Sequence, residues 1–264
     1  MRGCDVVNRE LWPIPRDAIR GAARATLGTG MGEHRLRYKN VNRYILNRAL
    51  RDFAGGIEAG AIVLDIGAGS GHYRDYFTGR RYVAVDMGLE QLTYKGLDVA
   101  GDILALPFRD SVADYAVCVE VLEHVYERRE FLGELRRVLK DGGRILLSVP
   151  LCIGEHMRPY DYFRYTRFGL ERVLSQGGFK LITMQQRGGY FVFLAYHVRR
   201  FPEYLVSSAN IPGWIRKVLL RLFSPVFTYI IPFFLHCLDG LDGKSDITLG
   251  YTCILEKGQS ARMP

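Results

Sequence analysis

The stretch that most constrains the fold is VLDIGAGSG at residues 63–71. An apolar run ends in Asp65–Ile66, and glycines then occupy alternate positions at Gly67, Gly69 and Gly71. A continuous apolar run is typical of a strand that is buried on both faces. Glycines lack a Cβ, so the backbone can turn sharply and a ligand can approach its N–H groups. The stretch therefore predicts a buried strand followed by a nucleoside-binding loop.

The glycine spacing narrows the class of ligand. In the dinucleotide fingerprint, glycines occupy the first, third and sixth positions. Here the sixth position is His72, and the fifth position is a glycine instead. This spacing favours a nucleoside ligand other than a nicotinamide or flavin dinucleotide, and it leaves a nicotinamide oxidoreductase as an outside alternative.

Strand-like and helical patterns alternate along the chain. Strands are predicted at 61–66, 81–86, 97–103, 114–120, 143–150, 180–186 and 247–257. Helices are predicted from Tyr38 to the Gly55-Gly56 pair (with Val41, Ile45, Ala49 and Phe53 on one face), over 123–140, and from a Thr166 cap to about Ser175. This alternation predicts an α/β fold with a doubly wound, Rossmann-like parallel sheet.

Composition bounds the class of protein. The 264 residues are 48% hydrophobic and carry a net charge of +8, which suits nucleic acid, an anionic membrane surface or phosphate-bearing substrates. The five cysteines are scattered without a CxxC pair, so no structural zinc site is predicted and a reducing compartment is favoured. The N-terminal residues have no apolar core of signal-peptide length, so we expect a cytoplasmic protein.

Acidic residues stand at the ends of four predicted strands, at Asp65, Asp86, Asp102 and Glu120. Ligands of open α/β sheets bind at the carboxyl ends of the strands, and acids are depleted within strands. An edge with four acids would repel a pyrophosphate. It would suit a ligand with ribose hydroxyls, an adenine amino group and positive charge. Capping of the following helices is the alternative role for these acids.

In this order, VLDIGAGSG, YVAVD, GDILALPF, EVLEHV and ELRRVLKDGGRILLSVP resemble the successive motifs of class I S-adenosylmethionine-dependent methyltransferases. The resemblance is to the small-molecule subgroup that carries VLEHV, and it covers roughly residues 60–150. It implies a seven-stranded sheet of order 3-2-1-4-5-7-6 whose last strand is antiparallel. It also implies S-adenosylmethionine as the cofactor.

The resemblance assigns cofactor contacts to residues that share the strand ends: Asp65, Gly67, Gly69, Gly71, Asp86, Met87, Asp102, Ile103 and Glu120. Asp86 would bind the ribose hydroxyls, and Met87 would pack on adenine. Asp102 would accept from the adenine amino group, with Ile103 beside it. The glycines and Glu120 would lie near the methionine part, and Asp65 would orient the loop.

The loop after the fifth strand, at 153–174, is expected to cover the transferable methyl group. Methyl transfer from a sulfonium requires alignment, and a hydroxyl or amine acceptor also requires a base. His156 is the first candidate for that base and His124 the second; backbone hydrogen bonding and helix-start packing are their respective alternatives. Candidate acceptor contacts are Tyr160, Asp161, Tyr162, Arg164 and Tyr165. An Asp161–Arg164 ion pair that only holds the loop is the alternative for those two.

The same loop resembles a subset of bacterial and archaeal methyltransferases with a His-x-x-Pro-Tyr-Asp-Tyr-x-Arg-Tyr-Thr stretch. Members of that subset often belong to cell-surface glycan or lipid-linked sugar pathways. The resemblance therefore implies a small-molecule, sugar or lipid-linked glycan acceptor, with a hydroxyl as the methylated group. An RNA or protein methyltransferase is one alternative, supported by the basic N-terminus, and a cofactor-binding scaffold is another. Nucleic acid is not favoured as a partner.

A large apolar insert separates the last two predicted strands. Its segment 213–223 predicts a helix with one apolar face and with Arg216, Lys217 and Arg221 outside that face. Such a helix can lie in a membrane interface. The following residues, 222–238, are almost wholly apolar, and Pro225 and Pro232 are expected to interrupt them.

Three regions follow from these patterns. We predict an N-terminal helical cap or lid at 1–57, a cofactor-binding core at 58–187 and 247–258, and a basic, apolar helical insert at 188–246. Contact with the inner face of a membrane through 213–238 is the favoured role of the insert. A cap on the catalytic domain, a homodimer contact and a transmembrane span are the alternatives, the span being the least favoured.

Overall fold

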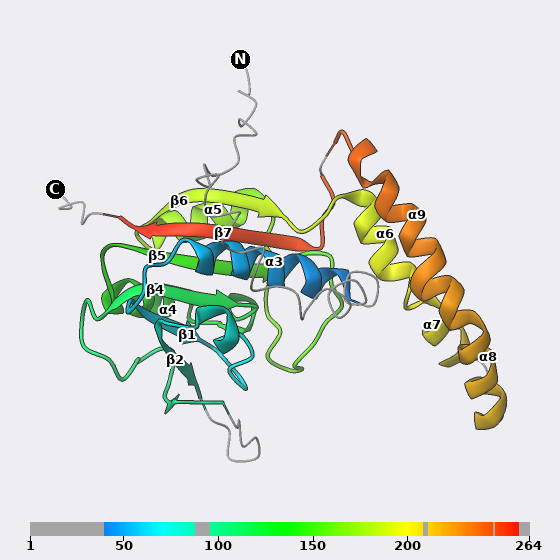
Figure 1. Ribbon diagram of the computed structural model, residues 1–264, viewed down its shortest axis with the longest axis horizontal. Helices are drawn as coiled ribbons and strands as arrows, with labels where there is room; N and C mark the ends of the chain where they lie inside the picture. The colour runs from blue at the N-terminus through cyan, green and yellow to red at the C-terminus, as the bar shows by residue number, and fades with distance from the viewer. Residues whose placement is uncertain (1–39, 88–95, 208–210, 245, 259–264) are drawn as a thin grey trace.

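The computed structural model describes residues 40–87, 96–207, 211–244 and 246–258. A seven-stranded sheet forms its centre, with the strand order β3-β2-β1-β4-β5-β7-β6 (Figure 1). The strands are β1 (Ile62–Ile66), β2 (Arg81–Asp86), β3 (Val99–Ala100), β4 (Ala113–Val119), β5 (Leu139–Pro150), β6 (Phe179–Gln186) and β7 (Gly250–Lys257). Strands β1 to β5 pair in parallel, and β7 runs antiparallel to both β5 and β6. The predicted order and the antiparallel last strand are confirmed.

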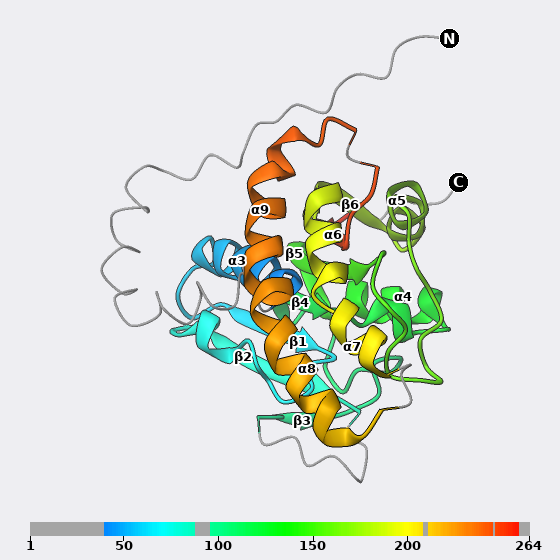
Figure 2. The same ribbon diagram turned by 90° about the vertical axis from the view of Figure 1, so that its right-hand side faces the viewer.

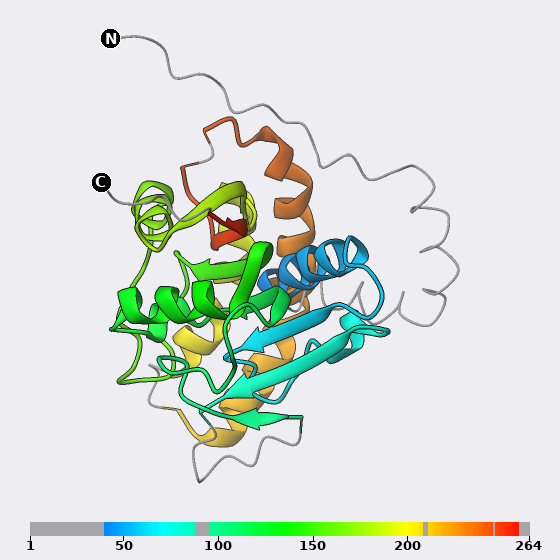
Figure 3. The same ribbon diagram turned by 90° about the vertical axis from the view of Figure 1, so that its left-hand side faces the viewer.

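Helices cover both faces of the sheet. Helix α3 (Val41–Gly55) and the 3-10 turn η1 (Arg74–Phe77) lie on one face, and α4 (Arg128–Val138) and α5 (Arg167–Gln176) lie on the other (Figure 3). The side chains of β1 alternate between these layers, since Leu64 and Ile66 join the core under α4 and Val63 joins the core under α3. Burial on both faces explains why this strand reads as a continuous apolar run.

Two predicted helices differ from the structure. The predicted helix at 123–140 is instead a 3-10 turn, η2 (Leu122–His124), followed by α4, and β5 already begins at Leu139. A helix would need the Glu123 carbonyl for its own hydrogen bonds. That carbonyl instead accepts the N–H groups of Tyr162 and Phe163, at 3.0 and 3.2 Å. The loop after β5 thus determines where the helix can begin.

Helix α3 begins later than expected and is rotated slightly. Tyr38 and the rest of residues 1–39 of the predicted cap lie outside the described residues. Asn40 caps the helix by accepting the N–H of Arg43 at 3.1 Å. Its buried face consists of Val41, Leu46, Leu50 and Ala54, whereas Ile45, Ala49 and Phe53 are only half-buried. This face packs directly on the sheet.

The insert forms a helical arm between β6 and β7. Its elements are α6 (Tyr190–Val198), α7 (Phe201–Ser207), α8 (Gly213–Pro225), the π-helical turn η3 (Val226–Ile230), α9 (Ile231–Leu238) and the 3-10 turn η4 (Asp239–Leu241). The arm leaves the sheet on one side (Figure 1), and α9 lies beside α6 (Figure 2). Its base is tied to the core by Val192 of α6, which packs with Val41 of α3 and Leu249.

The expected interruption at Pro225 and Pro232 is wrong. Helical structure continues from Gly213 to Leu241. Pro225 is followed directly by the π-helical turn η3, a local adjustment that accommodates the missing proline N–H. Pro232 is the second residue of α9, so this turn lies between the two prolines. By length and composition this helix could cross a membrane, and only 6% of its most apolar 18-residue window is buried.

The two limbs of the arm are joined at their base by carboxylates. Asp239 Oδ1 accepts the N–H of Val192 at 3.1 Å, and Asp242 Oδ2 accepts the N–H of Tyr190 at 2.9 Å. Both carboxylates thus cap the N-terminus of α6, where backbone N–H groups lack helical partners. The arm is therefore a closed hairpin of helices whose two ends meet at adjacent strands.

Candidate cofactor and acceptor site

The glycine loop directly follows β1, as predicted, and all three glycines have positive φ angles of 74°, 54° and 66°. A Cβ at Gly67 would stand 2.4 Å from a methyl group of Val121, and one at Gly71 would stand 2.6 Å from the Gly96 carbonyl oxygen. A Cβ at Gly69 would meet nothing within 4 Å. Gly67 and Gly71 therefore permit close packing of the loop, and Gly69 is its open side, where a ligand can reach the backbone.

Asp86 connects the end of β2 to this loop. Its Oδ2 accepts the N–H of Gly69 at 2.8 Å, and its Oδ1 accepts the N–H of Met87 at 2.8 Å. A carboxylate offers about four acceptor positions, so both oxygens keep capacity for the two hydroxyls of a ribose. The Met87 side chain is 56% exposed beside it. These residues fit the nucleoside part of S-adenosylmethionine.

The end of β3 contributes a second carboxylate at the same edge. Asp102 Oδ1 accepts the N–H of Leu104 at 2.8 Å, which fixes the loop that follows the strand. The Asp102 side chain is exposed, and Ile103 beside it is half-buried against the core. An acceptor beside an apolar side chain is the pairing that an adenine amino group and ring require.

Asp65 plays a different part from the other strand-end acids, because it is 1% exposed. The hydroxyl of Tyr82 on β2 donates to its carboxylate. Burial raises the pKa of Asp65 to about 7 and also raises the pKa of Tyr82. Asp65 therefore joins β1 to β2 directly below the glycine loop and does not face a ligand.

Glu120, at the end of β4, has an unusual backbone for a residue other than glycine, with a φ of 56°. Its Oε1 lies 2.9 Å from Nη2 of Arg187 and accepts the Ser148 hydroxyl at 3.2 Å. The Arg187 guanidinium is fully buried and also donates to the Val149 carbonyl at 2.7 Å. The sequence pattern does not predict a role for Arg187; its position directly after the strand predicted at 180–186 is the one signal for it.

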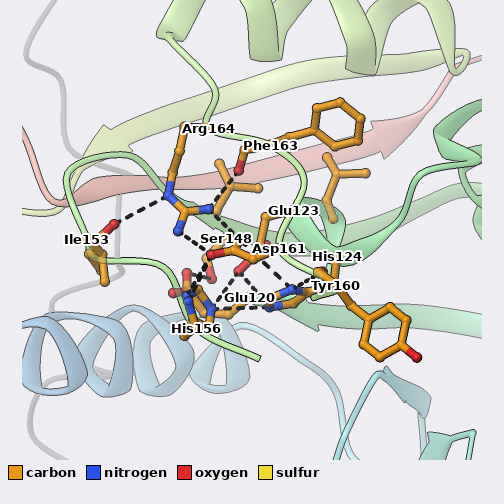
Figure 4. Close-up of polar contacts among 12 residues, drawn as sticks. Glu120, Glu123, His124, Ser148, Ile153, His156, Tyr160, Asp161, Phe163 and Arg164 are labelled. Atoms are coloured by element: carbon orange, nitrogen blue, oxygen red, sulfur yellow. Dashed lines mark hydrogen bonds and ion pairs between the residues drawn. The ribbon is translucent and has the colours of Figure 1, made fainter. Parts of the chain in front are cut away.

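A second group of polar side chains gathers where β4 and β5 end (Figure 4). Glu123 and His124 come from η2, and His156 comes from the loop after β5. The Nε2 atoms of the two histidines lie 3.1 Å apart, and Glu123 Oε1 lies 3.6 and 3.7 Å from them. The structure thus brings together both candidate bases. Glu123 is a further site residue that was not predicted, although it stands beside His124 in the EVLEHV motif.

Asp161 and Arg164 form a two-pronged ion pair with both N–O distances at 2.6 Å. Arg164 holds the pKa of Asp161 at about 2, far below its usual range, and Asp161 raises the pKa of Arg164. Asp161 Oδ2 also accepts the backbone N–H of His156 at 2.9 Å. The pair therefore fixes the position of His156. This agrees with the alternative in which the Asp161–Arg164 ion pair only holds the loop in place.

The tyrosines of the loop have different environments. Tyr165 is 5% exposed in the hydrophobic core, and its hydroxyl donates to the Leu122 carbonyl at 3.3 Å. Its side chain packs in the core instead of facing an acceptor. Tyr160 and Tyr162 are 59% and 44% exposed, and the Tyr162 ring stands edge-on to Tyr126. Tyr160 and Tyr162 are the tyrosines of this loop that an acceptor can reach.

The histidines stand next to a buried carboxylate. Glu123 raises the pKa of His156, and burial raises the pKa of Glu123 itself. A raised pKa makes a neutral imidazole a stronger base toward an acceptor proton. The site thus combines a loop suited to a nucleoside with a candidate proton acceptor where β4 and β5 end, along the same sheet edge.

Comparison with known proteins agrees with this geometry. The family described as "Methyltransferase domain" matches residues 64–147. An uncharacterized methyltransferase of Mycobacterium leprae is 33% identical over 110 residues, which are 38% of this chain and 41% of that protein. The demethylmenaquinone methyltransferase of Thermobifida fusca is 36% identical over 175 residues, which are 60% of this chain and 70% of that protein. The chain thus spans about two fifths of the length of the first curated relatives that it matches.

Solved structures show the same fold. The phosphoethanolamine N-methyltransferase 2 of Haemonchus contortus, in complex with S-adenosylhomocysteine, aligns with a TM-score of 0.53 at 16% identity over 94% of this chain and 62% of that one. The [4+2]-cyclase SpnF aligns with a TM-score of 0.52 at 18% identity over 80% of this chain and 81% of that one. Because this chain covers 70% of the Thermobifida protein at 36% identity, it belongs to the class I S-adenosylmethionine-dependent methyltransferases.

Proposed function

We propose that the protein transfers a methyl group from S-adenosylmethionine to a hydroxyl of a small-molecule acceptor, in particular a sugar or a lipid-linked glycan. The observation that carries the proposal is the His124–His156 pair, held against a buried carboxylate at the sheet edge that also carries the glycine loop. A hydroxyl acceptor must lose its proton as its oxygen bonds to the methyl carbon, and a histidine with a raised pKa suits this task.

The roles of the residues follow from their positions. S-adenosylmethionine, when bound, supplies the methyl group on a positively charged sulfur. Gly69 opens the backbone to the cofactor, and Asp86 holds its ribose. His156 takes the acceptor proton, while Asp161 and Arg164 keep His156 in place. The exposed rings of Tyr160 and Tyr162 provide flat apolar faces on which a sugar ring can stack.

The helical arm supports an acceptor that resides in a membrane. We propose that the arm lies in the membrane interface and does not cross the bilayer. Its two limbs return to adjacent strands. Arg199 and Arg200 lie between α6 and α7, and Glu203 lies within α7, so charged residues interrupt that limb. Large apolar side chains are exposed along the other limb, including Trp214, Leu222, Phe234 and Leu241. An apolar helix with basic residues on its polar side suits an anionic lipid surface.

The location of the arm is tested by sedimentation with vesicles of phosphatidylcholine and phosphatidylglycerol. The proposal predicts that the full chain pellets with these vesicles. A chain that stays in the supernatant at every lipid concentration would overturn the membrane assignment and favour a subunit contact or a cap. Protection of the arm from protease on both sides of a sealed vesicle would instead indicate a span.

The acceptor is tested by transfer of a labelled methyl group to separate acceptor fractions. The fractions are extracted lipid-linked glycans, demethylmenaquinone (the acceptor in the name of the Thermobifida relative) and tRNA. The proposal predicts label in the glycan fraction, lost in Asp86→Ala and kept in the surface control Asp110→Ala, whose carboxylate is 77% exposed. Label in tRNA or demethylmenaquinone alone would overturn the acceptor assignment. Equal labelling by wild type and Asp86→Ala would overturn the site assignment.

A further inference from the structure

The cluster of Glu123, His124 and His156 has the composition of a metal site. Each residue offers one ligand atom, and these atoms all lie within 4.8 Å of one another. In Figure 4 the two imidazoles point toward each other from different segments of the chain, His124 from η2 and His156 from the loop after β5. Imidazole nitrogen and carboxylate oxygen are common ligands of divalent transition metals.

The hydrogen bonds of the two histidines leave one nitrogen of each ring without a proton, and these two nitrogens face each other where a cation could bind. His124 Nδ1 lies 2.8 Å from the Tyr160 carbonyl oxygen, and His156 Nδ1 lies 3.3 Å from the Gly154 carbonyl oxygen. A carbonyl can only accept, so each Nδ1 carries a proton. In the neutral rings both Nε2 atoms are then acceptors. They face each other at 3.1 Å, a distance at which two lone pairs repel unless a proton or a metal ion lies between them.

Glu123 supplies the second, independent observation. Its side chain is fully buried, and among the described residues neither carboxylate oxygen has a hydrogen-bond partner. The histidine Nε2 atoms at 3.6 and 3.7 Å are too distant for hydrogen bonds. Burial of a carboxylate without a hydrogen-bond partner is costly, whereas coordination of a metal ion would satisfy it.

The three ligand atoms have the spacing of one face of a coordination tetrahedron. With metal–ligand bonds of about 2.0–2.1 Å, tetrahedral ligands lie about 3.3 Å apart. The observed separations of 3.1, 3.6 and 3.7 Å bracket that value. Metal-bound histidines usually donate their other ring N–H to a carbonyl or carboxylate. Both Nδ1 atoms follow this pattern, and Asp161 Oδ2 lies 3.4 Å from His156 Nδ1.

We propose that Glu123, His124 and His156 bind a divalent transition-metal ion of the zinc type and leave at least one coordination position open. Two nitrogens and one oxygen favour such an ion over magnesium, which prefers oxygen ligands. With a metal ion bound, His156 would act as a ligand and no longer as the base. The role of the open position rests on the proposed function, because there the metal would hold the acceptor hydroxyl and lower its pKa, so that its proton leaves to solvent. Metal binding itself does not depend on that function.

The test is metal binding by the untagged full chain after treatment with a chelator. Zn²⁺ is titrated by calorimetry, and Co²⁺ is titrated by its visible absorption, which reports four-coordinate geometry. We expect one ion per chain. We also expect His124→Ala, His156→Ala and Glu123→Gln each to weaken binding at least 100-fold. His236→Ala removes a histidine of α9 and should leave the affinity unchanged.

Absence of Zn²⁺ and Co²⁺ binding to the wild-type chain would overturn the proposal and indicate a proton shared between the two histidines. Binding that survives all three ligand substitutions would overturn it as well. His156→Gln serves if His156→Ala fails to fold, because the loop position is only half-buried. No cofactor or acceptor is present in this titration. A wild-type chain that binds the metal ion but transfers no methyl group would therefore contradict the proposed function and leave the metal site standing.

Discussion

At the scale of single residues, the burial of Asp65 beneath the glycine loop carries a stability cost that depends on pH. Its carboxyl group is buried beneath the glycine loop, and its folded-state pKa is about 7 against an ordinary value of 3.8. As pH rises, the Asp65 carboxyl loses its proton at a lower pH in the unfolded chain than in the folded protein. Stability from Asp65 is therefore fully present below about pH 4 and is lost progressively up to about pH 7.

The variant Asp65→Asn should remove this pH dependence, because the amide stays neutral and its oxygen can still accept from Tyr82. Between pH 5 and pH 8 we expect the wild type to lose about 3 kcal/mol of unfolding free energy relative to the variant. Urea unfolding at the two pH values measures the difference. Parallel pH profiles for both proteins would show that Asp65 is ionised in the folded state.

Substitutions at Gly67 and Gly69 can distinguish a glycine that is needed for packing of the loop from one that is needed for access of the cofactor. Both Gly67→Ala and Gly69→Ala place a Cβ at a positive φ, which costs about 1–2 kcal/mol. Gly67→Ala additionally forces the Cβ against Val121, which adds about 1–3 kcal/mol. Gly69→Ala has open space around its Cβ.

We therefore expect Gly67→Ala to lower the unfolding free energy more than Gly69→Ala. Gly69→Ala should weaken S-adenosylmethionine binding with a smaller effect on folding. Chemical unfolding and calorimetric titration of the cofactor check the two halves of this prediction. The reverse order of stabilities would contradict the packing that we assign to Gly67.

At the scale of elements, the arm carries two exposed basic side chains, Lys217 and Arg221, on a helix whose apolar residues are also exposed. Each basic residue near an anionic lipid surface contributes about 1 kcal/mol. The double variant Lys217→Gln/Arg221→Gln should lose about 10- to 30-fold in affinity for vesicles that contain phosphatidylglycerol. Its affinity for pure phosphatidylcholine vesicles should not change. An equal loss on both kinds of vesicle would indicate misfolding of the arm.

Elements also show where sequence reasoning succeeded and failed. Strands β1, β2 and β4 and residues 145–150 of β5 were predictable because burial on both faces makes each a largely apolar run, whereas the exposed first residues of β5 carry no such signal. The helix predicted at 123–140 failed at its start, because the Glu123 carbonyl is used by a loop forty residues further on. The arm was predicted as an apolar helix, but its continuity through two prolines depends on a π-helical turn that no local pattern indicates.

At the scale of the whole molecule, the sheet brings residues that are far apart in the sequence together at one edge. The strand-end acids could be predicted from the sequence, because parallel strands place their carboxyl ends together. The strand order came from the family resemblance and is confirmed. Arg187, Glu123 and the inward orientation of Tyr165 could not be predicted, because each depends on contacts between segments that are far apart in the chain.

The central claim is that this edge binds S-adenosylmethionine through the glycine loop and Asp86. Calorimetric titration of the cofactor into the full chain tests it most directly. We predict one site per chain and at least a 10-fold weaker affinity for Asp86→Ala, because one hydrogen bond to a charged acceptor contributes about 1.5–3 kcal/mol. Asp110→Ala should bind as the wild type does. No binding by the wild type, or equal affinities for wild type and Asp86→Ala, would contradict the account.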